Sequence, residues 1–170
     1  STAHRVMYVS DWLANKFSEL YQLPKIREME EAVAQTRAAV ADLETRLARF
    51  QQKRREIFYS ARLNMDTELD RVFQIQHHQF QLDARRRKSP FTLEDKTRYE
   101  RIKEEVEGLE RKIDSEIYLR FPRSPEFLST FRRLNQAIVQ SLQEWVRIEE
   151  DEREKSEVLS KLMDGYRGSN

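Results

Sequence analysis

Histidines and carboxylates are the side chains of this sequence that could bind a metal ion or exchange protons with a substrate. His77 and His78 are adjacent, and neighbouring side chains on a helix point about 100° apart. No carboxylate or third histidine stands near them in the sequence to complete a metal site. We therefore interpret both histidines as surface or packing residues and predict no metal site.

Acidic pairs have the spacing that acid and base catalysis would use, but they lie on strongly charged segments. Glu104 with Glu107 is one such pair, and Glu149 with Glu152 is another. Solvated helix faces explain them better, because no pocket is predicted around them. The chain has no Cys and only three Gly, so we expect neither a thiol nucleophile nor a glycine-rich phosphate loop. The prediction is a non-enzymatic protein with no catalytic residue, no cofactor and no small-molecule substrate.

Composition predicts a folded chain with a heavily charged surface. Of its 170 residues, 36% are charged and 38% are hydrophobic, and 31 Lys and Arg against 30 Asp and Glu leave a net charge of +1. That balance creates no overall attraction for nucleic acid, so we expect no nucleic-acid partner. Nine Phe, six Tyr and two Trp are more aromatic surface than disordered chains carry. No apolar stretch approaches the roughly 20 residues that cross a bilayer, which predicts a soluble intracellular segment.

Prolines divide the helical apolar pattern into separate elements, because proline removes a hydrogen-bond donor and fixes φ. Thr92 and Asp95 have the spacing of a capping box at one helix start. The predicted class is all-α, an elongated antiparallel helical bundle with one very long helix and a protruding coiled-coil dimerisation segment. The predicted elements are an N-terminal amphipathic helix in 1–23, an elongated three-helix coiled-coil bundle in 25–164 with helices at about 25–88, 92–120 and 125–164, and a flexible tail in 165–170.

Apolar residues in the first half of the helix predicted at 25–88 alternate three and four apart, which is coiled-coil spacing. The helix predicted at 92–120 is too short to fold back over them, so no helix of the same chain would cover this stretch. We predict a self-association seam between two copies, in a homodimer or higher oligomer. In the competing interpretation the N-terminal helix folds back over the stretch. The positions of Trp12 and Phe17 would decide between the two interpretations. The predicted seam residues are Ile26, Met29, Val33, Val40, Leu43, Leu47, Phe50 and Ile57.

Two polar residues interrupt the apolar stripes of the predicted helices. Arg54 occupies a seam position, and Asn135 lies on the helix predicted at 125–164. Polar residues at such positions can fix the register or orientation of a coiled coil.

Four consecutive cations, Arg85, Arg86, Arg87 and Lys88, end the helix predicted at 25–88. Four charges exceed what is needed to complement a helix dipole. Three interpretations stay open: a solvated helix end, an anionic membrane surface at about 1 kcal/mol for each cation, or nucleic-acid phosphate. We take these residues as a candidate contact for anionic lipid or for a partner.

Three strings of the sequence carry a family resemblance. They are Arg87, Lys88, Ser89, Pro90, Phe91, Thr92, Asp95, Arg98 and Tyr99 at one joint, Trp12, Phe17, Leu23, Ile26, Arg27 and Glu28 near the start, and Tyr118, Leu119, Arg120, Phe131, Arg133, Leu134, Ala137, Ile138 and Ser141. They resemble segments of a family of mitochondrial inner-membrane coiled-coil proteins, which includes the fungal protein governing inner-membrane morphology and fission and the animal coiled-coil protein described as a mitochondrial potassium channel. The stretch between Ile26 and Arg87 is longer than in the fungal pattern.

The resemblance implies a self-associating scaffold domain at the mitochondrial inner membrane, with a role in membrane morphology or fission. It carries over no catalytic residue, because the shared positions are packing and capping residues. Two alternatives stay open. A membrane-curvature dimer of the BAR type would gather its cations on one concave face, and a cytoskeletal or protein-tethering coiled coil would have no lipid role.

Overall fold

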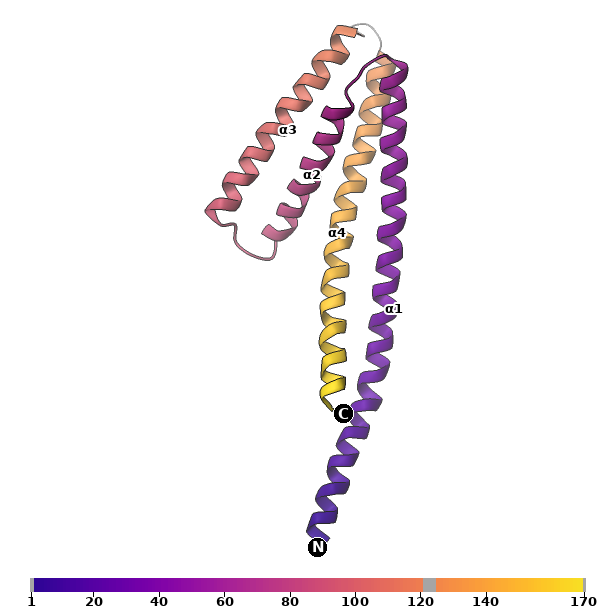
Figure 1. Ribbon diagram of the computed structural model, residues 1–170, viewed down its shortest axis with the longest axis vertical. Coiled ribbons are helices and arrows are strands. Elements are labelled where there is room, and N and C mark those ends of the chain that lie inside the picture. Colours follow the sequence, from indigo (N-terminus) through magenta and orange to yellow (C-terminus); the bar gives the residue numbers. More distant parts are fainter. Residues whose placement is uncertain (1, 121–124, 170) are drawn as a thin grey trace. The chain divides into compact units, whose positions relative to one another are not determined.

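The computed structural model describes the backbone of residues 2–120 and 125–169 and most of their side chains. These residues form helices α1 (Thr2–Ser60), α2 (Asp66–Arg86), α3 (Leu93–Arg120) and α4 (Pro125–Ser169), with no strand among them (Figure 1). The predicted all-α class is confirmed for this part of the chain. The side chain of Phe17, which was to decide between two interpretations of the seam, lies outside the described residues.

The helices divide into two units, each of which we describe by itself. Unit 1 consists of Ser1–Val40 and Ile148–Asn170, and unit 2 consists of Ala41–Arg147. Helices α1 and α4 contribute to both units, whereas α2 and α3 belong to unit 2 alone.

Unit 1 pairs the N-terminal part of α1 with the C-terminal part of α4. Arg37 on α1 donates from Nε to Oε1 of Glu152 on α4 at 3.0 Å. One turn away, Lys155 donates from Nζ to the hydroxyl oxygen of the buried Thr36 at 3.3 Å. The buried apolar residues of α1 in this unit recur at heptad spacing, at Ile26, Val33 and Val40.

Unit 2 packs residues 41–60 of α1 and 125–147 of α4 with α2 and α3, and α2 lies between α3 and the α1–α4 pair (Figure 1). One apolar cluster around Phe58 joins all four helices. A second, around Leu142, joins α1, α2 and α4, and a third, around Leu82, joins α2 to α3. Each of these three side chains is 0% exposed, and each burial contributes roughly 1.5–3 kcal/mol. Helix α2 therefore packs against α1 and α4 on one side and against α3 on the other.

The predicted helix boundary at Pro24 is wrong, because α1 runs through this proline without a break. Proline inside a helix removes the hydrogen bond to the carbonyl four residues earlier, here Leu20. Both Pro24 and Leu20 are exposed, so that carbonyl lies on a face where water can replace the missing donor. The separate helix predicted in 1–23 is the start of α1, and it does not fold back over the heptad stretch.

The predicted single helix at 25–88 is also wrong, because the chain reverses direction between α1 and α2 (Figure 1). Arg62 adopts a φ of 58° in the left-handed region. Its N–H donates to the Tyr59 carbonyl, and the N–H of Leu63 donates to the Phe58 carbonyl, both at 2.9 Å. This is a Schellman motif, whose left-handed residue is usually glycine. Leu63 then packs in the same apolar cluster as Phe58, which completes the helix stop.

The heptad residues of α1 are covered by α4 of the same chain, so the expectation that this stretch has no helix of its own chain beside it is wrong. Leu47, which is 2% exposed, clusters with Ile138 and Leu142 of α4. Among the predicted seam residues, Ile26, Val33, Val40, Leu43 and Leu47 are buried within one chain, and Met29, Phe50 and Ile57 are half-buried. A dimer seam through these residues would require α1 and α4 to separate.

Helix α3 begins with the predicted capping box. The N–H of Asp95 donates to the Thr92 hydroxyl oxygen at 3.1 Å, and the N–H of Thr92 donates to the Asp95 carboxylate at 3.3 Å. The predicted tail in 165–170 is wrong for residues 165–169, which belong to α4. A helical glycine costs about 1 kcal/mol, and the half-buried Met163 and Tyr166 on either side of Gly165 offset that cost by packing.

Candidate functional site

Four cations lie together where α2 ends in unit 2. Arg85 and Arg86 form the last turn of α2, and Arg87 is its C-cap. The N–H groups of Lys88 and Ser89 both donate to the Arg85 carbonyl at 3.1 Å, which closes a tight turn after the helix. The side chains of residues 85–88 are all exposed. We call these four residues the basic cluster.

Among the described residues, ion pairs occupy some arginines of unit 2 but not those of the basic cluster. Arg55 pairs with Asp70 at 3.0 Å, and Arg71 pairs with Glu105 at 2.8 Å. Within the described part of the chain, the three arginines of the cluster form no ion pair. Their guanidinium donors are therefore open to an external anion, which arginine binds through charge-assisted hydrogen bonds.

Exposed apolar surface adjoins the basic cluster. Leu93, the first residue of α3, is 81% exposed. Phe91 is half-buried, and its ring lies 5.4 Å from the Arg86 guanidinium carbon and 6.1 Å from the Tyr99 ring. Cations beside an exposed apolar side chain suit a membrane interface, where the charge meets headgroups and the apolar group meets acyl chains.

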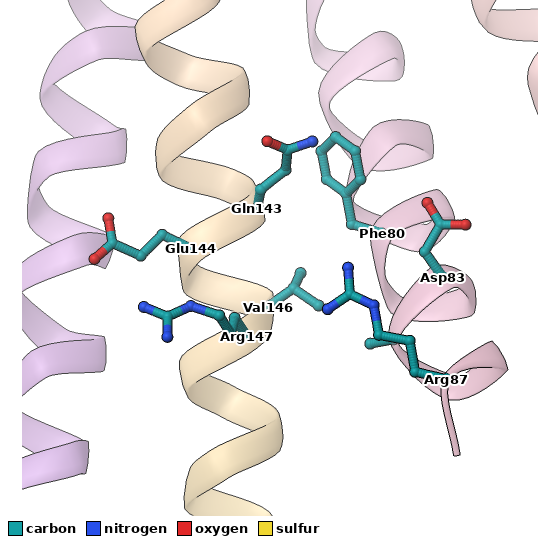
Figure 2. Close-up of a pocket in the computed structure, with 8 residues that line it drawn as sticks. Phe80, Asp83, Arg87, Gln143, Glu144, Val146 and Arg147 are labelled. Carbon is teal, nitrogen blue, oxygen red and sulfur yellow. The ribbon is translucent and has the colours of Figure 1, made fainter. Parts of the chain in front are cut away.

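Arg87 also lines a groove of about 440 Å³ between α2 and α4. Figure 2 shows its side chain reaching from the end of α2 toward Val146 on α4, with Asp83 one turn earlier on α2. The groove has apolar walls and a polar rim of both signs, formed by Phe80, Ala84 and Val146, and by Asp83, Arg87, Gln143, Glu144 and Arg147.

Sequence reasoning identified Arg87 but missed the other residues of this groove. The spacing within each helix was a usable signal, because residues 80, 83, 84 and 87 share one face of α2, and residues 143 and 147 share one face of α4. Bringing those two faces together required the break between α1 and α2, which the sequence analysis did not place.

His77 on α2 packs against α4, which agrees with the packing role that was one of the two predicted for it. Its ring stacks on that of Trp145, with centroids 4.8 Å apart and an interplanar angle of 18°. Burial, and secondarily the nearby His78, lowers the pKa of His77 below its ordinary value. The folded protein therefore favours the neutral imidazole. Within the described residues, no group of three or more His, Asp or Glu side chains is placed to hold a metal ion.

The acidic pairs considered for catalysis occupy different surroundings. Glu104 and Glu107 are exposed, and Glu152 is held by Arg37. A carboxylate that the sequence analysis did not single out, Glu110, lines a smaller groove of about 270 Å³ together with Asp114. Burial, and then the charges of Asp114 and Glu107, raises the pKa of Glu110. The cationic Arg132 and two side-chain amides also line this groove. Its described lining residues include no hydroxyl or thiol side chain that the carboxylates could activate.

Among the described residues, no helix is both long and apolar enough to cross a bilayer. Comparison of the chain with protein-family models, with curated proteins and with solved structures finds no match in any of the three.

Proposed function

We propose that this protein is a non-enzymatic helical scaffold that acts at an anionic membrane surface through its basic cluster. The observation that supports this function is the exposure of four consecutive cations, three of them without an ion pair among the described residues, beside the exposed Leu93. Each cation near an acidic membrane contributes about 1 kcal/mol. Insertion of Leu93 adds an apolar contribution that salt does not screen.

The resemblance of residues 12–141 to mitochondrial inner-membrane coiled-coil proteins supports the inner membrane as the location and membrane morphology or fission as the process. In this proposal the helices serve as a spacer that presents the basic cluster to the bilayer. The charge distribution favours this scaffold over a curvature dimer, because Lys and Arg alternate with Asp and Glu along the helices of unit 2.

Flotation with lipid vesicles tests the proposal. The purified chain should float with vesicles that contain anionic lipid at low salt and should be released as salt rises, because the Debye length falls to about 10 Å at 0.1 M ionic strength. Vesicles of phosphatidylcholine alone should leave the chain at the bottom of the gradient. Absence from the floating fraction at every salt concentration would contradict the membrane function.

A second candidate function, self-association through the N-terminal part of α1, has its own supporting observation. Val9, Trp12, Leu13 and Leu20 are 54%, 55%, 44% and 70% exposed. Their spacing places them along one stripe of the helix, and an apolar stripe of this kind marks a contact with another chain. This candidate keeps the predicted self-association but moves it from the covered heptad residues to the exposed start of α1.

Light scattering tests the second candidate. Replacing Leu13 and Leu20 by Asp should lower the molar mass of the particle in solution while leaving the helix content unchanged. Leu119→Asp is the matched control, because Leu119 is also exposed, at 78%, but lies on α3. Equal masses for the unaltered chain and the double variant would exclude a contact through this stripe.

A further inference from the structure

We infer that the groove between α2 and α4 binds the headgroup of an aminophospholipid, with the phosphate at Arg87 and the ammonium group at Asp83. This inference rests on the proposed membrane function and deepens it, since it assigns a lipid class to a surface that charge alone would not discriminate. All the residues involved belong to unit 2.

The phosphate position follows from the placement of Arg87. Its side chain lies between the two helices beside Val146 (Figure 2), and within the described residues it has no ion-pair partner. A guanidinium presents two parallel N–H groups to two oxygens of one phosphate. Gln143 lines the same groove from α4 and adds an amide donor. The remaining cations of the basic cluster lie next to Arg87 in the sequence and add to the positive potential at the phosphate position.

The ammonium position follows from the acidic residue on the same helix face. Asp83 and Arg87 are four residues apart, which places them about one turn from each other, yet they form no ion pair with each other or with other described residues. In an ethanolamine headgroup an ethylene chain joins the phosphate to the ammonium group, so one headgroup presents both charges to a pair of side chains whose Cβ atoms lie about 5–6 Å apart. It can therefore satisfy both side chains at once, with the anion on Arg87 and the cation on Asp83.

The apolar wall of the groove suits the part of the lipid next to its headgroup. Phe80, Ala84 and Val146 are the apolar residues that line the groove, and they can contact the glycerol and the first methylene groups. Glu144 and Arg147 form the α4 side of the rim and carry opposite charges.

Soluble short-chain lipids test the inference without a membrane. Labelled protein is titrated with dihexanoyl phosphatidylethanolamine, phosphatidylcholine and phosphatidylglycerol while the amide signals of the groove residues are followed by NMR. The three probes share the phosphodiester, but only the first has an ammonium group with N–H donors. We expect a Kd for the ethanolamine lipid about tenfold lower than for the other two, as charge-assisted hydrogen bonds would give. Equal Kd values for the three lipids would overturn the inference.

Asp83→Asn separates the inference from simple charge attraction, because it should not weaken binding to anionic vesicles but should remove the preference for the ethanolamine lipid. The variant removes a negative charge next to the basic cluster, so its flotation with anionic vesicles should be unchanged or stronger. Its preference for the ethanolamine lipid should disappear. The matched control is Glu100→Gln, which removes an exposed negative charge on α3 outside the groove and should keep the preference. Retention of the preference in Asp83→Asn would show that the ammonium group is not bound there.

Failure of the inference and failure of the proposed function give different results. Salt-sensitive flotation together with equal affinity for the three soluble lipids rejects the headgroup site and keeps the membrane scaffold. A preference for the ethanolamine lipid without flotation keeps the headgroup site and rejects the scaffold that charge attraction would hold on the membrane. Circular dichroism confirms for every variant that the helix content is unchanged.

Discussion

Arg54 on α1 donates from Nη1 to Oδ1 of Asn135 on α4 at 2.8 Å, and Arg54 is only 3% exposed. Burial lowers the pKa of this guanidinium to about 10, although Asp70 acts in the opposite direction. The fold therefore disfavours the charge that it encloses. The hydrogen bond between Arg54 and Asn135 fixes the register of α1 against α4 in unit 2, because only one register brings the two polar groups together.

Removing the Asn135 side chain, which accepts the Arg54 hydrogen bond, should destabilise the fold, because the buried guanidinium then loses a partner. Asn135→Leu should lower the free energy of unfolding by about 2–4 kcal/mol, since it leaves the Arg54 guanidinium without this partner. Adding Arg54→Met should restore most of the loss, because an apolar pair has no desolvation cost. Urea denaturation of the single and double variants measures both effects, with Gln136→Leu at the neighbouring exposed position as control. Losses that simply add in the double variant would mean that the two residues are not coupled.

The turn after α1 should respond to substitution in the reverse of the usual order. Arg62 holds a left-handed φ of 58°, so Arg62→Gly should raise the free energy of unfolding by up to about 1 kcal/mol. Arg62→Val should lower it by about 1–2 kcal/mol, because β-branched residues are strained there. At the exposed helical position Arg101, glycine should instead destabilise by about 1 kcal/mol. Thermal unfolding distinguishes the two sites, and destabilisation by glycine at both would contradict the Schellman assignment.

Local signals in the sequence predicted two helix starts, although the proline signal failed at Pro24, which α1 runs through. Thr92 with Asp95 predicted the start of α3, and Pro125 predicted the start of α4, because capping and a fixed φ act locally. The turn at Arg62 was missed because its signal is tertiary. An arginine takes the place of the usual glycine there, and the stop depends on the packing of Leu63 against Phe58.

The candidate site was predictable in part for the same reason. Consecutive cations at residues 85–88 are visible in any sequence, and their exposure follows from their charge. The groove that Arg87 shares with α4 depends on which helices are neighbours. The sequence analysis predicted one helix where the structure has α1 and α2. In the structure Leu43 and Leu47 are buried by packing of α1 with α4, whereas the heptad pattern had assigned them to a contact with a second copy.

Leu47 should behave as a core residue of a single chain. Leu47→Asp should lower the free energy of unfolding by about 3 kcal/mol or more, because it buries a carboxylate among leucines and isoleucine of α4. Leu119→Asp, at a position that is 78% exposed, should change it by less than about 0.5 kcal/mol. Urea denaturation at two protein concentrations also separates the interpretations. With Leu13 and Leu20 also replaced by Asp, so that the start of α1 makes no contact between chains, core packing within one chain predicts an unfolding midpoint that does not depend on concentration, whereas a dimer seam through Leu47 predicts one that does.

Stability should fall in mild acid through His77. Its pKa in the folded protein lies below the ordinary value of 6.5, so the unfolded chain binds this proton more readily. The contribution of neutral His77 is fully present above pH 6.5 and is lost as the pH falls below 6.5 toward the folded pKa. His77→Phe, which keeps a ring against Trp145, should flatten the decrease in melting temperature between pH 7 and pH 5. His78→Gln should retain most of the decrease, because burial is the larger cause of the shift, and an identical slope in His77→Phe would contradict this assignment.

The most direct test of the membrane proposal compares two variants of equal net charge in the same flotation experiment. One variant replaces the basic cluster by Gln, and the other replaces four exposed cations of α3 by Gln, namely Lys96, Arg101, Lys103 and Arg111. We expect the first variant to lose roughly a thousandfold of its binding to anionic vesicles, at about 1 kcal/mol for each of the four cations removed, while the second floats like the unaltered chain. Equal flotation of both variants, whether retained or lost, would contradict a specific role for residues 85–88.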